Sequence, residues 1–186
     1  MSSFEATTGY VPGAIGRVVE LHAQYYAEHW NFGSFFEAKV AAELSDFISG
    51  YNQAKDCIWL LSINGNIEGS ISIDGSSQAQ NIAHLRWFII SDSLRGKGAG
   101  NYLMKQAMAF CEQKGYEAVY LWTFQGLDPA KHLYEKYGFK LVEERSGKQW
   151  GLLSLSSASR RKFEGPIMHN KVLLWKNYSP VLVFFQ

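Results

Sequence analysis

The sequence predicts a single α/β domain, with a mixed central β-sheet and helices on both faces. The first observation is the length of 186 residues, which suits one ordinary domain. The second is the composition, with 47% hydrophobic and 19% charged residues, enough to bury a core. The third is the alternation of helical and strand-like apolar patterns along the chain, which is typical of this fold class. We expect the domain to span residues 1–158 and a divergent extension to cover residues 159–186.

Two amphipathic helices are expected near the start of the chain. Apolar side chains recur at helical spacing from Gly13 to Glu28 and again from Phe35 to Ser49. Gly50 is a natural stop for the second helix. An aromatic loop is expected between the two helices, over residues 28–33.

A β-hairpin and a buried strand follow. The runs Cys57–Ile63 and Ile67–Ile73 flank Asn64-Gly65-Asn66, and Asn-Gly between apolar runs strongly favours a hairpin turn. The next run, Ile82–Ile90, is apolar on both faces, which is typical of a central strand covered on both sides.

The remaining chain alternates between helices and strands. Asp128 is expected to cap the second of these helices, because Pro129 is favoured at the first helical position. The expected elements are a helix from Gly100 to Lys114, a strand over Ala118–Thr123, a helix from Pro129 to Tyr137, a strand over Phe139–Glu144 and a divergent strand over Leu152–Ser156.

Composition excludes several classes of protein. A net charge of +1 without a basic stripe argues against binding to nucleic acid. The two cysteines are too few for a disulfide framework and lack the spacing of a zinc site. The N-terminus does not resemble a signal peptide, and no apolar run reaches the roughly 20 residues that cross a bilayer. We therefore expect a cytoplasmic protein without a metal, and no nucleic acid or membrane as partner.

A glycine-rich turn follows the buried strand and precedes a helix. The turn reads Arg95-Gly96-Lys97-Gly98-Ala99-Gly100. Glycine lets the backbone approach a ligand, and the free amides of a helix N-terminus bind anions such as a diphosphate. The turn is not a Walker A loop, because no Ser or Thr follows a Gly-Lys pair. It also lacks the third glycine of a dinucleotide-binding fingerprint, since Leu103 stands there. The alternative is a turn that binds no ligand.

This turn resembles the R/Q-x-x-G-x-G/A motif of the GNAT acetyltransferases. A second segment, Ala130–Phe139, is similar to the A-x-x-L-Y-E-K-x-G-F segment of that family, and the two stand at the family's usual separation. The resemblance covers about Tyr10 to Gly151. One departure is Leu127, where many family members have an asparagine, so a side-chain contact to the cofactor would be missing.

Further stretches resemble more narrowly the acetyltransferase half of proteins that fuse a MarR-type DNA-binding domain to a GNAT domain. No helix-turn-helix pattern stands before them, so regulation of DNA is not expected. These stretches are Gly13–Arg17, His84–Phe88, Leu121–Phe124 and Gly126–Asp128.

The resemblance implies that acetyl-CoA is the co-substrate and that two central strands splay apart to admit it. The backbone of Phe88, Ile89 and Ile90 would bond the pantetheine arm as an added strand does, and an amide there would polarise the thioester carbonyl. The glycine-rich turn, with all six residues Arg95, Gly96, Lys97, Gly98, Ala99 and Gly100, would hold the diphosphate.

The acetyl transfer also requires proton movements. Tyr134 occupies the position of the tyrosine that protonates the leaving thiolate in many family members. A primary amine with a pKa near 10.4 must lose a proton at pH 7, at a cost of roughly 4–5 kcal/mol, so a base is useful. His84 is the candidate base, since imidazole is available at neutral pH. The alternative for His84 is a histidine bonded within the sheet. Glu68 is the reserve base, unless it is a solvent-facing residue.

The acceptor is expected to be a primary amine of a small molecule, bound between the first two helices and the strand ends. If Arg86 faces that site, it would hold a carboxylate, which favours an amino-acid-like substrate. The aromatic side chains suit a core or a homodimer surface as well as a pocket. The predicted substrate-binding residues are Tyr26, Trp30, Arg86 and Trp122.

Two other functions remain open at this point. One is a non-catalytic sensor that binds acyl-CoA, although such a sensor needs neither His84 nor Tyr134. The other is an acetyltransferase that modifies a protein lysine or N-terminus.

The tail also has two interpretations, because no acidic residue follows Glu164. It is either an extension that forms an interface or the product of a shifted reading frame.

Overall fold

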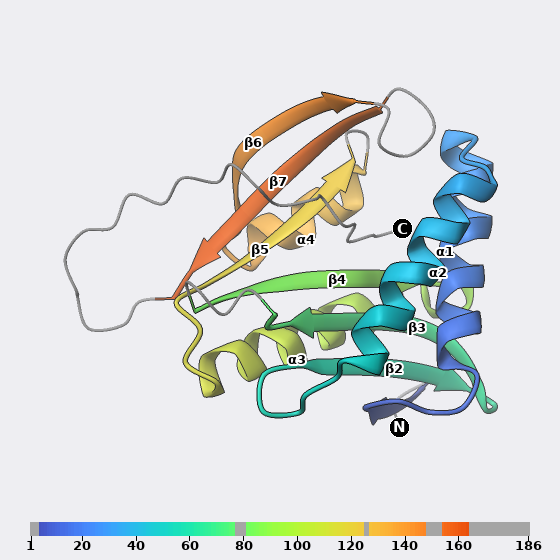
Figure 1. The fold of residues 1–186 in the computed structure, drawn as a ribbon, viewed down its shortest axis with the longest axis horizontal. Helices are drawn as coiled ribbons and strands as arrows, with labels where there is room; N and C mark the ends of the chain where they lie inside the picture. Colours follow the sequence, from blue (N-terminus) through green and yellow to red (C-terminus); the bar gives the residue numbers. More distant parts are fainter. Residues whose placement is uncertain (1–3, 77–80, 125–126, 148–153, 164–186) are drawn as a thin grey trace.

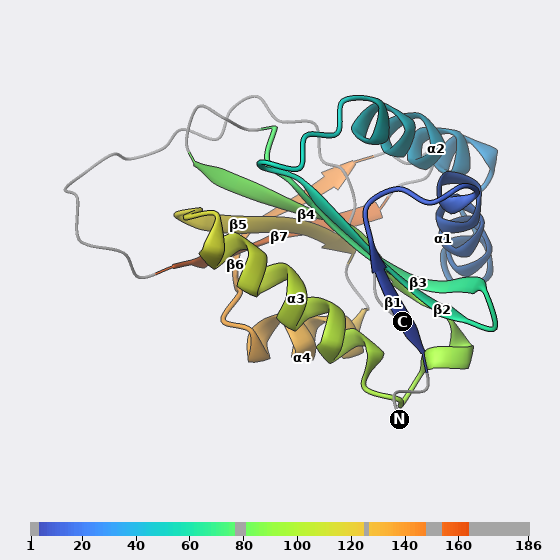
Figure 2. The ribbon, with the colours of Figure 1, turned by 90° about the horizontal axis from the view of Figure 1, so that it is seen from below.

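The computed structural model of the chain describes residues 4–76, 81–124, 127–147 and 154–163. A seven-stranded sheet in the order β1-β2-β3-β4-β5-β7-β6 forms the centre (Figure 1). Helices α1 and α2 cover one face of the sheet, and α3 and α4 cover the other (Figure 2). The elements are β1 (Glu5–Thr8), α1 (Ala14–Trp30), α2 (Ser34–Ser49), β2 (Cys57–Ile63), β3 (Asn66–Asp74), β4 (Ile82–Ile90), the short 3-10 helix η2 (Asp92–Leu94), α3 (Ala99–Gln113), β5 (Ala118–Phe124), α4 (Asp128–Lys136), β6 (Lys140–Gly147) and β7 (Ser154–Lys162). The predicted fold class is confirmed.

Both predicted N-terminal helices are present. Their buried stripes include Val18 and Tyr26 of α1 and Phe36 and Leu44 of α2, all of them almost fully buried. Helix α1 continues to Trp30, so the expected aromatic loop is helical over its first three residues. The helix ends where Asn31 adopts a left-handed conformation with φ 55°, a common way to stop a helix.

The predicted hairpin joins β2 and β3. Asn64 and Gly65 have φ values of 50° and 80°, as a type I′ turn requires. Strand β4 is buried along its whole length, as expected for a central strand. Its pairing with β3 shifts register between Ser70 and Ser72, and opposite this irregularity Trp87 has a φ of 45°.

The elements differ from the prediction in three places. Helix α4 begins at Asp128, so the residue before the helix is Leu127 and not Asp128. Strand β7 inserts between β5 and β6 and runs to Lys162, beyond the boundary expected at residue 158. Strand β1 was not predicted. Leu152 and the tail from residue 164 onward lie outside the described residues.

The two central strands pair only at their beginnings. Parallel pairing of β4 with β5 covers Ile82↔Ala118, Ala83↔Val119 and His84↔Tyr120. Beyond His84 the strands diverge (Figure 1), which confirms the predicted splay. We call the unpaired stretches, residues 85–90 of β4 and 121–124 of β5, the β4–β5 fork.

Candidate active site

A cavity of about 490 Å³ lies between the glycine-rich turn and helix α4. Every residue of Arg95–Gly100 lines it except Lys97, which is exposed. His132 and Lys136 of α4 line it from the other side, and Ile90 lines it at the end of β4. The cavity therefore connects the predicted anion-binding turn with the predicted ligand-binding strand.

The turn has the backbone geometry of an anion site. Gly96 and Gly98 have φ values of 71° and 77°, and a Cβ at either would meet no atom within 4 Å, so the requirement for glycine is conformational. The first helical bond of α3 runs from the Tyr102 amide to the Gly98 carbonyl oxygen at 3.0 Å. The amides of the preceding first turn consequently have no partner within the helix, and the positive end of the helix dipole points the same way. Such an arrangement binds a phosphate group.

Charged side chains border this anion site on both sides. Arg95 forms an exposed ion pair with Asp92, a kind of pair that contributes little to stability and is easily exchanged. On the α4 side, Lys136 Nζ donates a hydrogen bond to Asn101 Oδ1 at 2.7 Å. His132 and Lys136 were not among the predicted site residues. Their spacing of four residues could have predicted that both side chains lie on one face of the helix.

The open edge of β4 continues the cavity into the sheet. On its other edge β4 pairs with β3, through Ile89↔Ser70 and Ile90↔Gly69. Along the fork, the edge of β4 that faces β5 has no strand partner among the described residues. Buried backbone groups need hydrogen-bond partners, so this edge suits an extended, amide-bearing arm. The positive φ of Trp87 lies beside the edge, and such outliers concentrate at functional sites. The turn, the cavity and this edge together fit coenzyme A.

Tyr134 lies in the layer between α4 and the sheet. Its side chain is 2% exposed, and its ring contacts Phe88 at 6.5 Å and Phe139 at 5.9 Å between centroids. Burial raises the pKa of Tyr134 well above its usual value, so the phenol stays protonated at neutral pH. Burial also raises the pKa of Tyr26 on α1, and charges on Tyr25 and Tyr134 raise it further. Tyr26 and Tyr134 thus come from helices on opposite faces of the sheet, and both phenols are buried.

Comparison with known proteins decides the family. The model of the Acetyltransferase (GNAT) family matches residues 16–139, about two thirds of the chain. The chain belongs to the GNAT acetyltransferase family. The matched span contains the glycine-rich turn, the fork and Tyr134.

Named relatives of this GNAT protein are distant. A Xenopus tropicalis protein named "Probable N-acetyltransferase camello" is 26% identical over 140 residues, which cover 75% of this chain and 64% of the relative. YwnH of Bacillus subtilis, whose name provisionally describes a phosphinothricin acetyltransferase, is 26% identical over 110 residues, 58% of this chain and 62% of YwnH. The chain thus spans less than two thirds of the length of these curated relatives.

Solved GNAT structures share the fold. A GNAT acetyltransferase from Staphylococcus aureus Mu50 aligns with a TM-score of 0.69 at 16% identity, over 86% of this chain and all of the other. The structure of yncA from Salmonella typhimurium, which contains its cofactor acetyl-CoA, aligns with a TM-score of 0.64 at 12% identity, over 90% and 99% of the chains. At these identities the likeness concerns the fold alone.

His84 lies at the vertex of the fork in this GNAT domain. It is the last residue of β4 that pairs with β5, and its ring stacks on Tyr120 with centroids 4.2 Å apart. The side chain is buried, with 6% exposed. His84 is thus packed within the sheet, beside the point where the strands separate.

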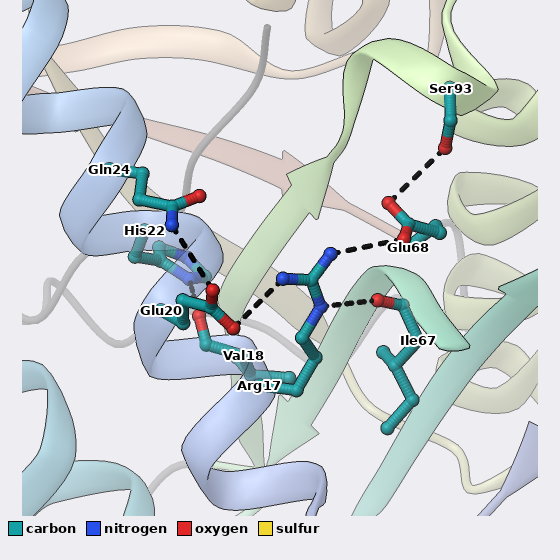
Figure 3. Close-up of polar contacts among 8 residues, drawn as sticks. All are labelled: Arg17, Val18, Glu20, His22, Gln24, Ile67, Glu68 and Ser93. Carbon is teal, nitrogen blue, oxygen red and sulfur yellow. Dashed lines mark hydrogen bonds and ion pairs between the residues drawn. The ribbon is translucent and has the colours of Figure 1, made fainter.

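Glu68, the reserve base, is held in a polar network (Figure 3). Its Oε1 lies 3.0 Å from a guanidinium nitrogen of Arg17, and its Oε2 accepts a hydrogen bond from Ser93 at 3.2 Å. Arg17 also donates to the Ile67 carbonyl oxygen at 2.9 Å. The alternative interpretation was that Glu68 faces the solvent, but its side chain is only 15% exposed. These contacts link α1 to the turn after β4 and argue against Glu68 as a base.

The predicted substrate-binding residues divide into separate groups. The rings of Tyr26 and Trp30 lie together, 5.3 Å between centroids, and Tyr26 also contacts Phe36 and Phe124 at the end of β5. Trp122 is 5% exposed and belongs to a different buried cluster on the sheet. Tyr26 and Trp30 are thus brought together beside the β5 end of the fork, whereas Trp122 is itself a residue of the fork.

Arg86 has a different environment from the one predicted. Its guanidinium is paired with Asp74 at 2.8 Å and Glu43 at 3.1 Å, and it lies 3.8 Å above the Trp87 ring. Burial favours a higher pKa for Asp74, but hydrogen bonds from Ser76 and the charge of Arg86 outweigh it and lower that pKa. A substrate carboxylate would have to displace two protein carboxylates. The structure therefore argues against the substrate role predicted for Arg86.

The described residues contain neither a membrane-spanning helix nor a metal-binding cluster. None of their helices is long and apolar enough to cross a membrane. Within the same part of the chain, no group of three or more His, Cys, Asp or Glu residues is arranged to hold a metal ion.

Proposed function

We propose that this chain transfers the acetyl group of acetyl-CoA to a primary amine of a small molecule by direct attack. The observation that carries the proposal is the cavity that joins the N-terminus of α3 to the open edge of β4, with Tyr134 buried beside that edge. Family membership supports the same activity. Bound acetyl-CoA would supply the acetyl group as an activated thioester.

Different residues of the chain bind the cofactor and move the protons. The amides of Gly96 and of Gly98–Gly100, with Arg95 and Lys136, hold the diphosphate, and the backbone of Phe88–Ile90 holds the arm along β4. Fixing the two reactants in one geometry provides most of the rate enhancement. Tyr134 keeps a proton at Oη because of its raised pKa and donates it to the leaving sulfur. His84 accepts the proton of the amine, either directly or through water.

The acceptor enters from the face covered by α1 and α2. Tyr26 and Trp30 border the fork there, and their rings suit the apolar part of a small acceptor. The likeness to YwnH favours an amino-acid-like amine such as phosphinothricin. This preference no longer draws support from Arg86, which is engaged by Asp74 and Glu43.

The proposal also includes three properties of the protein that were expected from the sequence. They are a closer relationship to the acetyltransferase half of MarR–GNAT fusions, a catalytic domain followed by an extension, and a cytoplasmic protein that acts without a metal. Neither nucleic acid nor membrane is part of the proposed activity, and a homodimer is compatible with it.

The test is calorimetry of the protein with acetyl-CoA, followed by a panel of primary amines in an assay for released CoA. We expect micromolar binding, on the order of −8 kcal/mol, and turnover with at least one amine. Tyr134→Phe should bind acetyl-CoA as the wild type does and lose most of the turnover, since only the proton donor is removed. Binding without turnover on every amine would favour a sensor, and no binding would refute the proposal.

A further inference from the structure

Thr123 stands in the unpaired part of β5, on one side of the β4–β5 fork. It lies three residues beyond Tyr120, the last residue of β5 that pairs with β4. At about 3.3 Å per residue this places it roughly 10 Å from the vertex of the fork. On its other edge, β5 pairs with β7 through Thr123↔Ser157.

The side chain of Thr123 points toward α4. Successive residues of a strand face opposite sides of the sheet. Phe124 faces α1, because its ring contacts Tyr26 at 5.6 Å between centroids. By this alternation Thr123 faces the other side of the sheet, the side that α3 and α4 cover in Figure 2. Tyr134 of α4 lies in this same layer, where it contacts Phe88 on the opposite strand of the fork.

The hydroxyl of Thr123 is buried without a hydrogen bond from the described part of the chain. The residue is 9% exposed, and Oγ1 has no partner there. A buried hydroxyl without a partner destabilises the folded state, and replacing it by a methyl group of the same shape is neutral or favourable. Stability alone would therefore favour valine at this position, since the Thr123 hydroxyl lowers the stability of the folded protein.

We propose that the Thr123 hydroxyl is a cofactor contact: it donates a hydrogen bond to the acetylated end of the pantetheine arm of acetyl-CoA in the fork. The inference rests on the proposed function and adds a residue of β5 to a site that the family motifs place on β4, α3 and α4. The contact holds the reacting end from the side opposite β4, next to Tyr134. It also provides a polar contact on this side of the fork, where Leu127 offers none.

Ser72 provides a matched control. It is also fully buried, and its Oγ likewise lacks a hydrogen-bond partner among the described residues. Ser72 lies on β3, which is paired on both edges, with Ile58 and with Arg86. An extended ligand has no place beside it. Ser72→Ala therefore removes a similar hydroxyl without touching the fork.

The experiment measures binding and stability of Thr123→Val, Thr123→Ser and Ser72→Ala. Calorimetry is run with acetyl-CoA and with adenosine 3′-phosphate 5′-diphosphate, which has the nucleotide and the diphosphate of CoA and no arm. We expect Thr123→Val to bind acetyl-CoA about 3- to 10-fold more weakly, as the loss of one hydrogen bond implies. Its affinity for the armless nucleotide should not change, and its Tm without ligand should equal or exceed that of the wild type. Thr123→Ser and Ser72→Ala should keep the wild-type affinity for acetyl-CoA.

Each other outcome overturns the inference. Unchanged affinity of Thr123→Val for acetyl-CoA overturns the contact while the proposed function stands. An equal loss with the armless nucleotide, or a lower Tm, assigns Thr123 a purely structural role. Absence of acetyl-CoA binding by the wild type overturns the proposed function and this inference with it.

Discussion

His22 provides a test of the packing of α1 that is independent of catalysis. Its side chain is fully buried, and the ring Nδ1 lies 2.7 Å from the Val18 carbonyl oxygen (Figure 3), so the neutral ring donates that hydrogen bond. Burial lowers the pKa of His22 from 6.5 to about 4, although the bond to Val18 acts in the opposite direction. The imidazole therefore remains neutral in the folded protein at pH values where it is charged in the unfolded chain.

The sign and size of the effect follow from this difference. Between pH 6.5 and 4 the unfolded chain binds the extra proton, so the free energy of unfolding decreases as the pH falls. A difference of 2.5 pKa units corresponds to about 3.4 kcal/mol in total, of which roughly 2.4 kcal/mol is lost between pH 7 and pH 4.5. Stability contributed by the neutral ring is fully present above pH 6.5.

The assay is urea unfolding of the wild type and His22→Asn at pH 8, 7, 6, 5 and 4.5. The asparagine amide can still donate to Val18 but does not titrate, so the variant should be less stable at pH 7 because of the volume lost. We expect the difference between the two proteins to be constant from pH 8 to 7 and then to shift by about 2 kcal/mol in favour of the variant by pH 4.5. Parallel stability curves over the whole range would refute the reasoning.

Three further predictions concern the site and its support. Arg86→Ala should lower the free energy of unfolding in urea by about 3–5 kcal/mol, because Asp74 stays buried without its counter-charge. The Michaelis constant of this variant for the acceptor should change less than twofold, and a large increase would restore the substrate role of Arg86. Lys136→Ala should weaken acetyl-CoA binding in calorimetry by about two- to fivefold and reduce its dependence on salt, since an exposed cation is removed. Gly98→Ala should destabilise the protein by about 1–2 kcal/mol in the same urea assay, because φ is 77° and no clash adds to the strain. An unchanged stability would contradict that conformation.

Local patterns predicted the elements that depend on local physics. Ile82–Ile90 was predicted with its observed bounds because a doubly covered strand is apolar throughout. The glycine-rich turn before α3 was predicted because its glycines and the following helix are contiguous in sequence, and its binding of an anion stays a prediction. Strand β1 was missed because four exposed residues carry no periodic apolar signal, and it forms only by pairing with β2.

Side chains whose roles depend on distant partners were harder to predict. The partners of Arg86 lie on α2 and β3, and those of Glu68 on α1 and in the turn after β4, so no sequence window contains them. The position of β7 between β5 and β6 is likewise a property of the assembled sheet. Thr123 was predicted to lie in a strand, but its unpartnered hydroxyl became visible only once the neighbouring strands were in place.

Three residue pairs join the halves of this sheet, β1–β4 on one side and β5–β7 on the other. The pantetheine arm of acetyl-CoA, bound along the open edge of β4, would act as an additional strand and link the two halves. Amide hydrogen exchange along that edge should then slow when acetyl-CoA is added, more than in the fully laddered β2–β3 hairpin. Bound acetyl-CoA would therefore complete the hydrogen bonding of the sheet, and the link between its two halves would weaken each time CoA is released.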